Sequence, residues 1–350
     1  MSVKSAAITV QEALGALTSG RSLTQEEARE VMAMIMRGEA TAAQIAGIVI
    51  ALRMKGETVD EITGFAEAMR AFAHRVPTSN DHLLDTAGTG GSGKQKFNVS
   101  TASAIIAAAA GVRVAKHGNR AMSGKSGSAD VLEALGVNIV LNSVQAAQCL
   151  RHVGICFLFA QEYHQSMKYA AGPRREIGIR TVFNLLGPLT NPAGADRQLL
   201  GVFEPGRTET IAAVLRNLGL RRGLVVASHD GLDEISISAP TKMTELNGAD
   251  IRTYDIAPED LGLDRHPLSA VAGGTAEENA DIIRRVFAGE KGAARDIVLA
   301  NAGACFYVAG RAASLAEGVR LAADVVDGGL AARKLDQLIS YTEALREDVS

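Results

Sequence analysis

Two different spacings of apolar residues divide the chain. From residue 10 to about residue 73, apolar side chains recur three and four positions apart, as in amphipathic helices. Thr24 and Thr58 each stand three positions before a glutamate, a pairing that caps helix amino termini, and Gly38 and Gly56 are typical helix ends. The pattern predicts four short helices. Because so few helices bury little surface alone, we expect a small all-helical domain with an extensive partner surface.

From residue 83 onward, short apolar runs alternate with helical segments. The predicted strands cover 83–87, 112–115, 138–141, 155–159, 199–203, 223–228, 233–238 and 241–246. The predicted helices cover 101–110, 129–135, 144–152, 208–218, 276–288, 295–308, 313–327 and 334–346. This alternation predicts βαβ units, and hence a larger α/β domain with a mainly parallel central sheet. Only 233–238 and 241–246 alternate like antiparallel strands.

Composition excludes several classes of protein. With 350 residues and 47% hydrophobic content the chain can form two domains and a substantial core, and a net charge of -3 argues against non-specific nucleic-acid binding. Cys149, Cys156 and Cys305 show no C-x-x-C spacing, so neither a disulfide framework nor a zinc site is predicted. Without a signal-peptide pattern or an apolar run near 18 residues, we expect a cytoplasmic protein with no membrane partner.

Segment 85–101 is the clearest candidate for chemistry. Its four glycines follow an apolar run, and the hydroxyls of Ser100 and Thr101 precede an alanine-rich helix. Glycine lets the backbone approach a ligand closely, so that successive N–H groups can point at one anion, and the helix behind adds its positive end. The order strand, glycine loop and helix predicts a phosphate site.

Neither common phosphate-loop pattern fits this segment. The dinucleotide fingerprint requires an acidic residue about 20 positions further on, but no Asp or Glu lies between Thr86 and Ala129. In the P-loop pattern, Gln95 stands where a metal-binding hydroxyl is needed. The acid-free window is instead basic, which favours an anion site over a solvated basic face. Its basic residues are Lys94, Lys96, Arg113, Lys116, His117, Arg120 and Lys125.

The motifs of the chain resemble, in order, those of the anthranilate phosphoribosyltransferase family, within the nucleoside-phosphorylase-like phosphoribosyltransferases. The motifs that carry the resemblance span nearly the whole chain and lie at 88–91, 98–101, 116–120, 124–130, 174–181, 184–192 and 231–234. The resemblance implies transfer of the 5-phosphoribosyl group from phosphoribosyl pyrophosphate to the amine of anthranilate, in tryptophan biosynthesis. It also implies Mg²⁺, as two ions, and a homodimer formed through the helical domain. That domain would comprise 1–74 and about 165–190, and the α/β domain 75–164 and 191–350.

The resemblance also implies roles for individual residues. Phosphoribosyl pyrophosphate would be bound by Gly88, Thr89, Gly90, Gly91, Asn98, Val99, Ser100, Thr101, Lys116, His117, Gly118, Asn119 and Ser128. Anthranilate would be bound by Gly88, His117, Asn119, His164, Arg174, Gly187 and Pro188, and the metal by Ser100, Asp233 and Glu234.

Other interpretations of these residues stay open. An adjacent acidic pair in a loop is ordinarily solvated, and an isolated histidine such as His117 is more often structural. Arg174 and Arg175 are placed at the amino terminus of a helix, where arginine is electrostatically unfavourable, and that misfit favours a functional role.

The chain departs from the family pattern at one position that bears on the metal. Ser92 stands where the family commonly has Asp, and Lys94 and Lys96 follow it. The loop loses a carboxylate and gains cations, which predicts a changed metal dependence or tighter binding of phosphoribosyl pyrophosphate.

Two alternative functions differ in specific features. A pyrimidine nucleoside phosphorylase has a first loop that resembles Lys-His-Ser-Thr-Gly-Gly, whereas this chain has Thr-Ala-Gly-Thr-Gly-Gly at 86–91. A non-catalytic relative that binds nucleic acid would need an extended basic surface and could dispense with Arg174 and the acidic pair.

Overall fold

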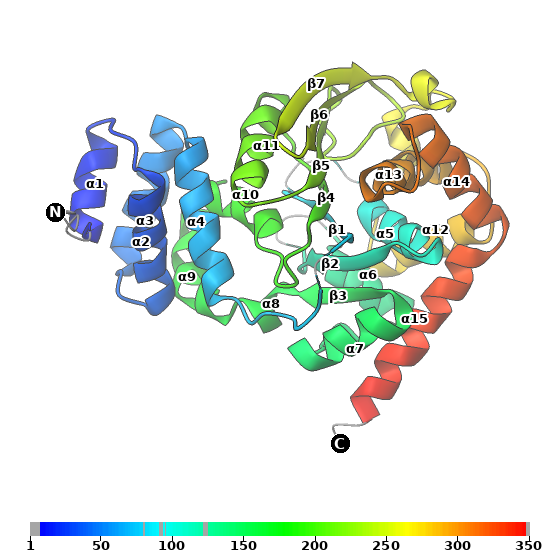
Figure 1. Cartoon of the computed structure of the whole chain (residues 1–350), viewed down its shortest axis with the longest axis horizontal. Helices are drawn as coiled ribbons and strands as arrows, with labels where there is room; N and C mark the ends of the chain where they lie inside the picture. Colours follow the sequence, from blue (N-terminus) through cyan, green and yellow to red (C-terminus); the bar gives the residue numbers. More distant parts are fainter. Residues whose placement is uncertain (1–7, 80, 91–93, 95, 122–124, 348–350) are drawn as a thin grey trace.

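A helical bundle and a larger α/β unit lie side by side in the computed structural model (Figure 1), which describes residues 8–79, 81–90, 94, 96–121 and 125–347. The bundle consists of α1 Val10–Thr18, α2 Gln25–Arg37, α3 Ala42–Lys55 and α4 Val59–Phe72. All four helices begin with a capping box on a threonine, two of which the sequence predicted. Each box satisfies amide N–H groups that the first turn would leave unpaired.

Two later helices join this bundle. The helices α9 Lys168–Ile177 and α10 Val182–Leu186 lie between the bundle and the sheet (Figure 1), and Ala170, Val182 and Phe183 belong to the same apolar core as the first four helices. They are reached through the short α8 Ala160–Tyr163 and the 3₁₀ turn η1 Gln165–Met167, and they are followed by η2 Gly187–Leu189.

The α/β unit is built on one seven-stranded sheet with the order β3-β2-β1-β4-β5-β6-β7. The strands are β1 Leu83–Gly88, β2 Arg113–Gly118, β3 Ile155–Phe159, β4 Arg197–Gly201, β5 Arg222–Ser228, β6 Thr241–Asn247 and β7 Asp250–Ile256. The first five are parallel, while β6 and β7 are antiparallel additions at one edge. The predicted fold class, a small helical domain plus an α/β domain with a mainly parallel sheet, is confirmed.

At β4 and β5, the two faces of the sheet belong to different cores. Leu199 and Leu224 pack against the helices of the α/β unit, whereas the next residues, Leu200 and Val225, belong to the core of the bundle.

The helices of the α/β unit are α5 Val99–Ala109, α6 Ser128–Leu135, α7 Ser143–Val153, α11 Thr208–Asn217, α12 Ala276–Phe287, α13 Ala293–Ala309, α14 Leu315–Asp327 and α15 Leu330–Glu347, with short 3₁₀ turns η3 Pro205–Arg207, η4 Pro258–Leu261 and η5 Leu268–Val271. Of these, α11 packs on the bundle side.

Two predicted strands are wrong. At 138–141 no strand forms, because the backbone N–H of Asn138 donates to Thr342 Oγ1 on α15 at 3.2 Å rather than to a neighbouring strand. At 233–238 the backbone is likewise held by side chains, with the N–H of Ile235 bonded to Asn301 Oδ1 at 3.0 Å. The strand β7 was not predicted, because its residues are mostly exposed and lack an apolar alternation.

The strand order predicts a ligand crevice at the carboxyl ends of β1 and β4. The chain passes from β1 through β2 to β3 on one side and resumes on the other side with β4, so the connections diverge between these two strands. Ligands of open α/β sheets bind beyond the strand ends at such a point. In the part of the chain that the structure describes, no helix is long and apolar enough to span a membrane.

Gly64 fixes the packing of α4 on α2. A Cβ atom at this position would clash with the backbone oxygen of Gln25, so Gly64→Ala is expected to lower the free energy of unfolding by about 2 kcal/mol or more. Gly15→Ala on α1 is the matched control, because no atom lies within 4 Å of its added methyl group. Urea denaturation measures both, and equal stabilities for the two variants would contradict the role of Gly64.

Candidate active site

The crevice is closed on one side by a segment that crosses the strand ends. Gly88 ends β1 beside Gly201 of β4, and the N–H of Thr89 donates to the Gly201 oxygen at 2.9 Å. A Cβ atom at Gly201 would clash with the backbone of Asp233, and one at Gly88 would lie 2.9 Å from Asp233 Oδ2. Two glycines at the strand ends therefore let the Asp233 segment approach the sheet closely.

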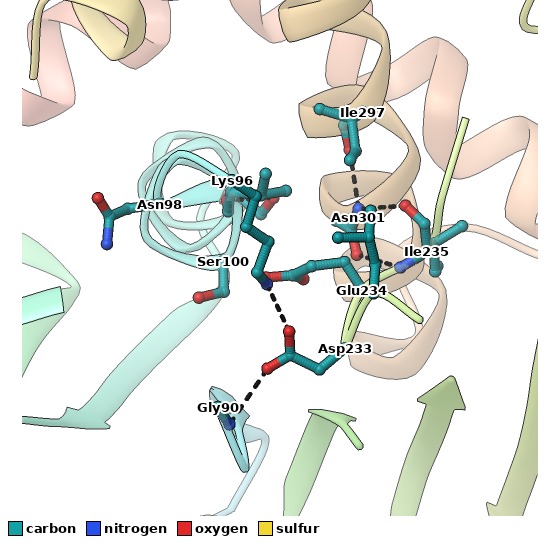
Figure 2. Close-up of polar contacts among 12 residues, drawn as sticks. Gly90, Lys96, Asn98, Ser100, Asp233, Glu234, Ile235, Ile297 and Asn301 are labelled. Carbon is teal, nitrogen blue, oxygen red and sulfur yellow. Dashed lines mark hydrogen bonds and ion pairs between the residues drawn. The ribbon is translucent and has the colours of Figure 1, made fainter. Parts of the chain in front are cut away.

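Asp233 and Glu234 are brought together with Lys96, which the motif reasoning did not assign to the site. Both carboxylates are buried in the connection between β5 and β6. The Nζ of Lys96 lies 3.0 Å from Asp233 Oδ1 and 2.5 Å from Glu234 Oε1, and the N–H of Gly90 donates to Asp233 Oδ2 at 3.1 Å. Figure 2 shows the Lys96 side chain reaching down to the two acids. The acidic pair is not solvated.

Asn301 on α13 holds the carboxylate segment in place (Figure 2). Its Oδ1 accepts from the N–H of Ile235 at 3.0 Å, and its Nδ2 donates to the oxygens of Ile235 at 2.9 Å and Ile297 at 2.8 Å. Asn301 is fully buried, so these bonds form away from competing water. The residue after Glu234 is thereby anchored to the helix layer behind it.

The charges of this cluster stabilise one another. Burial raises the pKa of Glu234, and the positive charge of Lys96 opposes that rise. Burial lowers the pKa of Lys96, but attraction to Asp233 and Glu234 outweighs it and leaves the pKa raised. The site therefore holds one ammonium against two carboxylates, and it can accept further positive charge.

A second lysine lies below the glycine loop. Lys116, at the end of β2, is buried, and its Nζ donates to the Thr86 oxygen at 2.5 Å and to Ser100 Oγ at 3.2 Å. Burial lowers its pKa, and the charge of Asp85 opposes the decrease. The Asp85 pKa is raised to about 6 by burial, while its Oδ1 accepts from the N–H of His117 at 3.1 Å. This contact ties the middle of β1 to the last part of β2.

The start of α5 is tied to a third segment. Asn98 does not cap the helix with its side chain; its Oδ1 accepts instead from Asn279 Nδ2 at 2.9 Å and from Ser126 Oγ at 3.2 Å. The buried Thr101 Oγ1 has no hydrogen-bond partner among the described residues, which leaves it able to bond a ligand.

His117 on β2 and His164, the residue after α8, lie together. Their ring centroids are 5.1 Å apart, and the Nε2 atoms of both rings are buried and without a partner in the described part of the chain. Burial lowers the pKa of His164 to about 4 and that of His117 well below its usual value, so both rings are neutral at pH 7. A hydrogen bond to the backbone of Gly187 places that residue against His117.

Arg174 lies at the opposite end of its helix from the end that the sequence suggested. It lies in the last turn of α9, where a positive charge is favourable, so the expected electrostatic misfit is wrong. Its guanidinium lies 5.1 Å from the centroid of the Phe183 ring, and burial lowers its pKa. Across the described residues it forms no ion pair, which leaves the guanidinium able to bind an anion.

The remaining predicted residues are placed as follows. Asn119 follows Gly118 at the end of β2, and its backbone oxygen accepts from Ser128 Oγ at 3.3 Å. The Pro188 oxygen accepts from Gln198 Nε2 at 2.7 Å, and Val99 is buried in the first turn of α5. Gly91 and Ser92 lie outside the described residues, so the predicted effect of Ser92 stays a prediction.

Part of the predicted basic cluster points elsewhere. Arg113 begins β2, at the opposite end of the sheet from the glycine loop, and donates to Thr78 and Ser79. Arg120 forms ion pairs with Asp130 and Glu133. The structure therefore provides no continuous basic surface from these residues, which argues against the nucleic-acid-binding alternative.

Comparisons with known proteins agree with this geometry. Residues 11–73 match the model of the glycosyl transferase family helical bundle domain, and residues 80–332 match that of the glycosyl transferase family a/b domain. The chain is 56% identical over 326 residues to an anthranilate phosphoribosyltransferase of Brevibacillus brevis, covering 93% of this chain and 96% of the relative.

Solved structures are similar over the same length. The anthranilate phosphoribosyltransferase of Thermus thermophilus has a TM-score of 0.89 and 45% identity, covering 95% of this chain and 99% of the other. That of Saccharomyces cerevisiae in complex with PRPP and Mg has a TM-score of 0.88 and 26% identity, covering 96% and 98%. The yeast enzyme has also been solved in complex with 4-fluoroanthranilate, with a TM-score of 0.86 and 25% identity, covering 96% and 98%.

The buried His164 predicts a loss of stability in acid. Its pKa is about 4 in the folded chain and about 6.5 when unfolded, so between these values only the unfolded state takes up the proton. Stability falls as the pH drops from 6.5 to 4, by about 3 kcal/mol from this group. His164→Gln should flatten that decrease in urea denaturation series, whereas His152→Gln, on the surface, should keep it. An unchanged slope in His164→Gln would contradict the prediction.

Proposed function

We propose that this chain, which belongs to the glycosyl transferase family that joins a helical bundle domain to an a/b domain, acts as an anthranilate phosphoribosyltransferase. It is a transferase, and the proposed reaction moves the 5-phosphoribosyl group of phosphoribosyl pyrophosphate to the amine of anthranilate. The products are N-(5-phosphoribosyl)anthranilate and pyrophosphate, in tryptophan biosynthesis. The observation that carries the proposal is the buried carboxylate pair beside the glycine loop at the ends of β1 and β4.

The donor is proposed to bind along the ends of β1 and β2 and the start of α5. Supporting observations are the Lys116 Nζ beside Ser100 Oγ and the Thr101 hydroxyl, which has no hydrogen-bond partner among the described residues. A buried ammonium and a helix amino terminus both attract phosphate oxygens. The proposed donor residues are Gly88, Thr89, Gly90, Gly91, Asn98, Val99, Ser100, Thr101, Lys116, His117, Gly118, Asn119 and Ser128.

Mg²⁺ is proposed to bind Asp233, Glu234 and Ser100, as two ions. The donor set fits, because Mg²⁺ prefers carboxylate and hydroxyl oxygens and the two carboxylates carry more charge than Lys96 neutralises. Among the described residues, no group of three or more His, Cys, Asp or Glu side chains adds further ligands. When bound, the metal would neutralise charge on the departing diphosphate. Asn301 and Gly90 hold the carboxylates in position for it.

The acceptor is proposed to bind against Gly88, His117, Asn119, His164, Gly187 and Pro188. The two neutral rings provide partly apolar surfaces, and their Nε2 atoms have no partner within the described ranges, which suits an aromatic amine. Since an arylamine is already neutral at pH 7, the residues need only position its nitrogen and no dedicated general base is required. Arg174 is proposed to bind the ring carboxylate, because it lies half-buried without an ion pair to any described residue.

The organisation of the chain completes the proposal. Residues 1–74 and about 165–190 would form the helical domain, and 75–164 and 191–350 the α/β domain. The shared core of α9 and α10 with the first four helices supports this division. We further propose a homodimer formed through the helical domain and a cytoplasmic location.

Anthranilate fluorescence tests the proposed reaction directly. Protein mixed with Mg²⁺, phosphoribosyl pyrophosphate and anthranilate should reduce anthranilate emission as the amine is substituted. Omitting either Mg²⁺ or the donor should leave the emission constant. If emission stays constant in the complete mixture while nucleobases or other ring carboxylates react, the acceptor assignment is wrong.

Arg174→Ala tests the acceptor site. Losing a guanidinium that clamps a carboxylate should raise the KM for anthranilate by about 10- to 100-fold and leave the KM for phosphoribosyl pyrophosphate nearly unchanged. The neighbouring Arg175→Ala is the control, because Arg175 is exposed on the same turn. Equal effects on the two KM values, or equal effects of the two variants, would reject the assigned role.

A further inference from the structure

Lys96 occupies a fixed position between the glycine loop and α5. The following residue, Phe97, is buried in the core, and its N–H lies 3.4 Å from the Val271 oxygen. The backbone of Lys96 packs so closely on Gly273 that a Cβ atom there would clash with it. The backbone of Lys96 is therefore held by Phe97 and Gly273, and its side chain extends toward Asp233 and Glu234 (Figure 2).

The ammonium group lies at the point where the two carboxylates converge. Its Nζ is 3.0 Å from Asp233 Oδ1 and 2.5 Å from Glu234 Oε1, and the side chains of all three residues are at most 17% exposed. Asp233 Oδ1 and Glu234 Oε1 are thus the two carboxylate oxygens that contact the ammonium. A metal ion bound to both oxygens would need the volume that the ammonium fills, because hard divalent cations take such oxygens at about 2.0–2.6 Å.

Two cations at this point would also repel each other. In a partly buried site, like charges a few ångströms apart interact far more strongly than they do in water. Lysine suits a reversible role here, because its long stem has several rotatable bonds and its charge is compact. The Lys96 ammonium and a metal ion bound to both carboxylates are thus alternative occupants of the same position.

We propose that Lys96 is a tethered counter-ion that competes with the divalent metal for Asp233 and Glu234, so that metal binding at this pair requires the ammonium to withdraw. The inference rests on the metal-binding role proposed above for these acids. It assigns to Lys96 a function that neither a purely structural ion pair nor a phosphate-binding lysine would have. Metal affinity in the absence of donor is set by the exchange of one cation for the other.

Metal titrations of the protein without donor test this competition. The probe is Mn²⁺, whose free ion is counted by electron paramagnetic resonance. Lys96→Met should bind Mn²⁺ at least about tenfold more tightly than the unsubstituted chain, since the competing charge is gone. Lys96→Arg, which keeps the charge, should bind no more tightly than the unsubstituted chain.

The matched control is Lys291→Met. Lys291 is exposed and pairs with Asp327, which Arg295 also contacts. Lys291→Met therefore removes the same charge as Lys96→Met, but from a different ion pair. It should bind Mn²⁺ like the unsubstituted chain. Equal Mn²⁺ affinity for Lys96→Met and Lys291→Met, with both variants folded by circular dichroism, would overturn the proposal.

A measurement on the unsubstituted protein covers the case in which Lys96→Met does not fold. Reductive methylation followed by mass spectrometry reports the reactivity of the Lys96 amine relative to that of Lys291. Saturating Mg²⁺ should raise the relative rate at Lys96 at least about threefold, because the displaced amine leaves its ion pair. An unchanged relative rate would overturn the proposal. Neither readout requires turnover, so an inactive enzyme with metal-sensitive Lys96 would count against the proposed reaction alone.

Discussion

The site depends on the close approach of one backbone segment to the ends of two strands. Asp233 lies directly against Gly201, where no side chain would fit, and its carboxylate comes within contact distance of Gly88. This approach brings a segment that follows β5 over the carboxyl ends of the paired strands β1 and β4. It also closes one wall of the crevice with backbone and places the acidic side chains in it. Without two small residues at neighbouring strand ends, the acids would lie further from the glycine loop.

Burying these acids has a cost that the surrounding structure offsets. Removing a carboxylate from water costs several kcal/mol unless charges or hydrogen bonds replace the solvent. Lys96 supplies the charge, the N–H of Gly90 supplies a hydrogen bond, and Asn301 fixes the backbone beside the pair. The same logic holds for Lys116, to which Thr86 and Ser100 provide oxygens, while no carboxylate of the described residues forms an ion pair with it. Such sites are prearranged to exchange an internal partner for a ligand.

Local signals in the sequence predicted the elements well and the long-range contacts poorly. The capping boxes at Thr24 and Thr58, the glycine helix ends and the apolar strands are readable because their physics acts over a few residues. The segment at 138–141 was mistaken for a strand because the partner that pairs with Asn138 lies 204 positions away on α15. Nor could β7 be predicted, since an exposed edge strand has no apolar pattern to read.

The candidate site shows the same difference between local signals, which could be predicted, and long-range contacts, which could not. The glycine loop and the carboxylates were found through motif order, but Lys96 lies 138 positions from Glu234, and only the fold joins them. Its one sequence signal was its place in a basic stretch free of acids, which also contained Arg113 and Arg120, whose partners lie elsewhere.

The division of the sheet between two cores has a consequence for how the molecule holds together. The apolar interior of the bundle continues without interruption through Leu200 and Val225 onto one face of the sheet. The linkers between the units are thus not mechanically weak points, because a shared apolar core spans them. Any rotation of the bundle against the sheet must slide packed side chains over one another, which favours small shear displacements over a wide hinge opening.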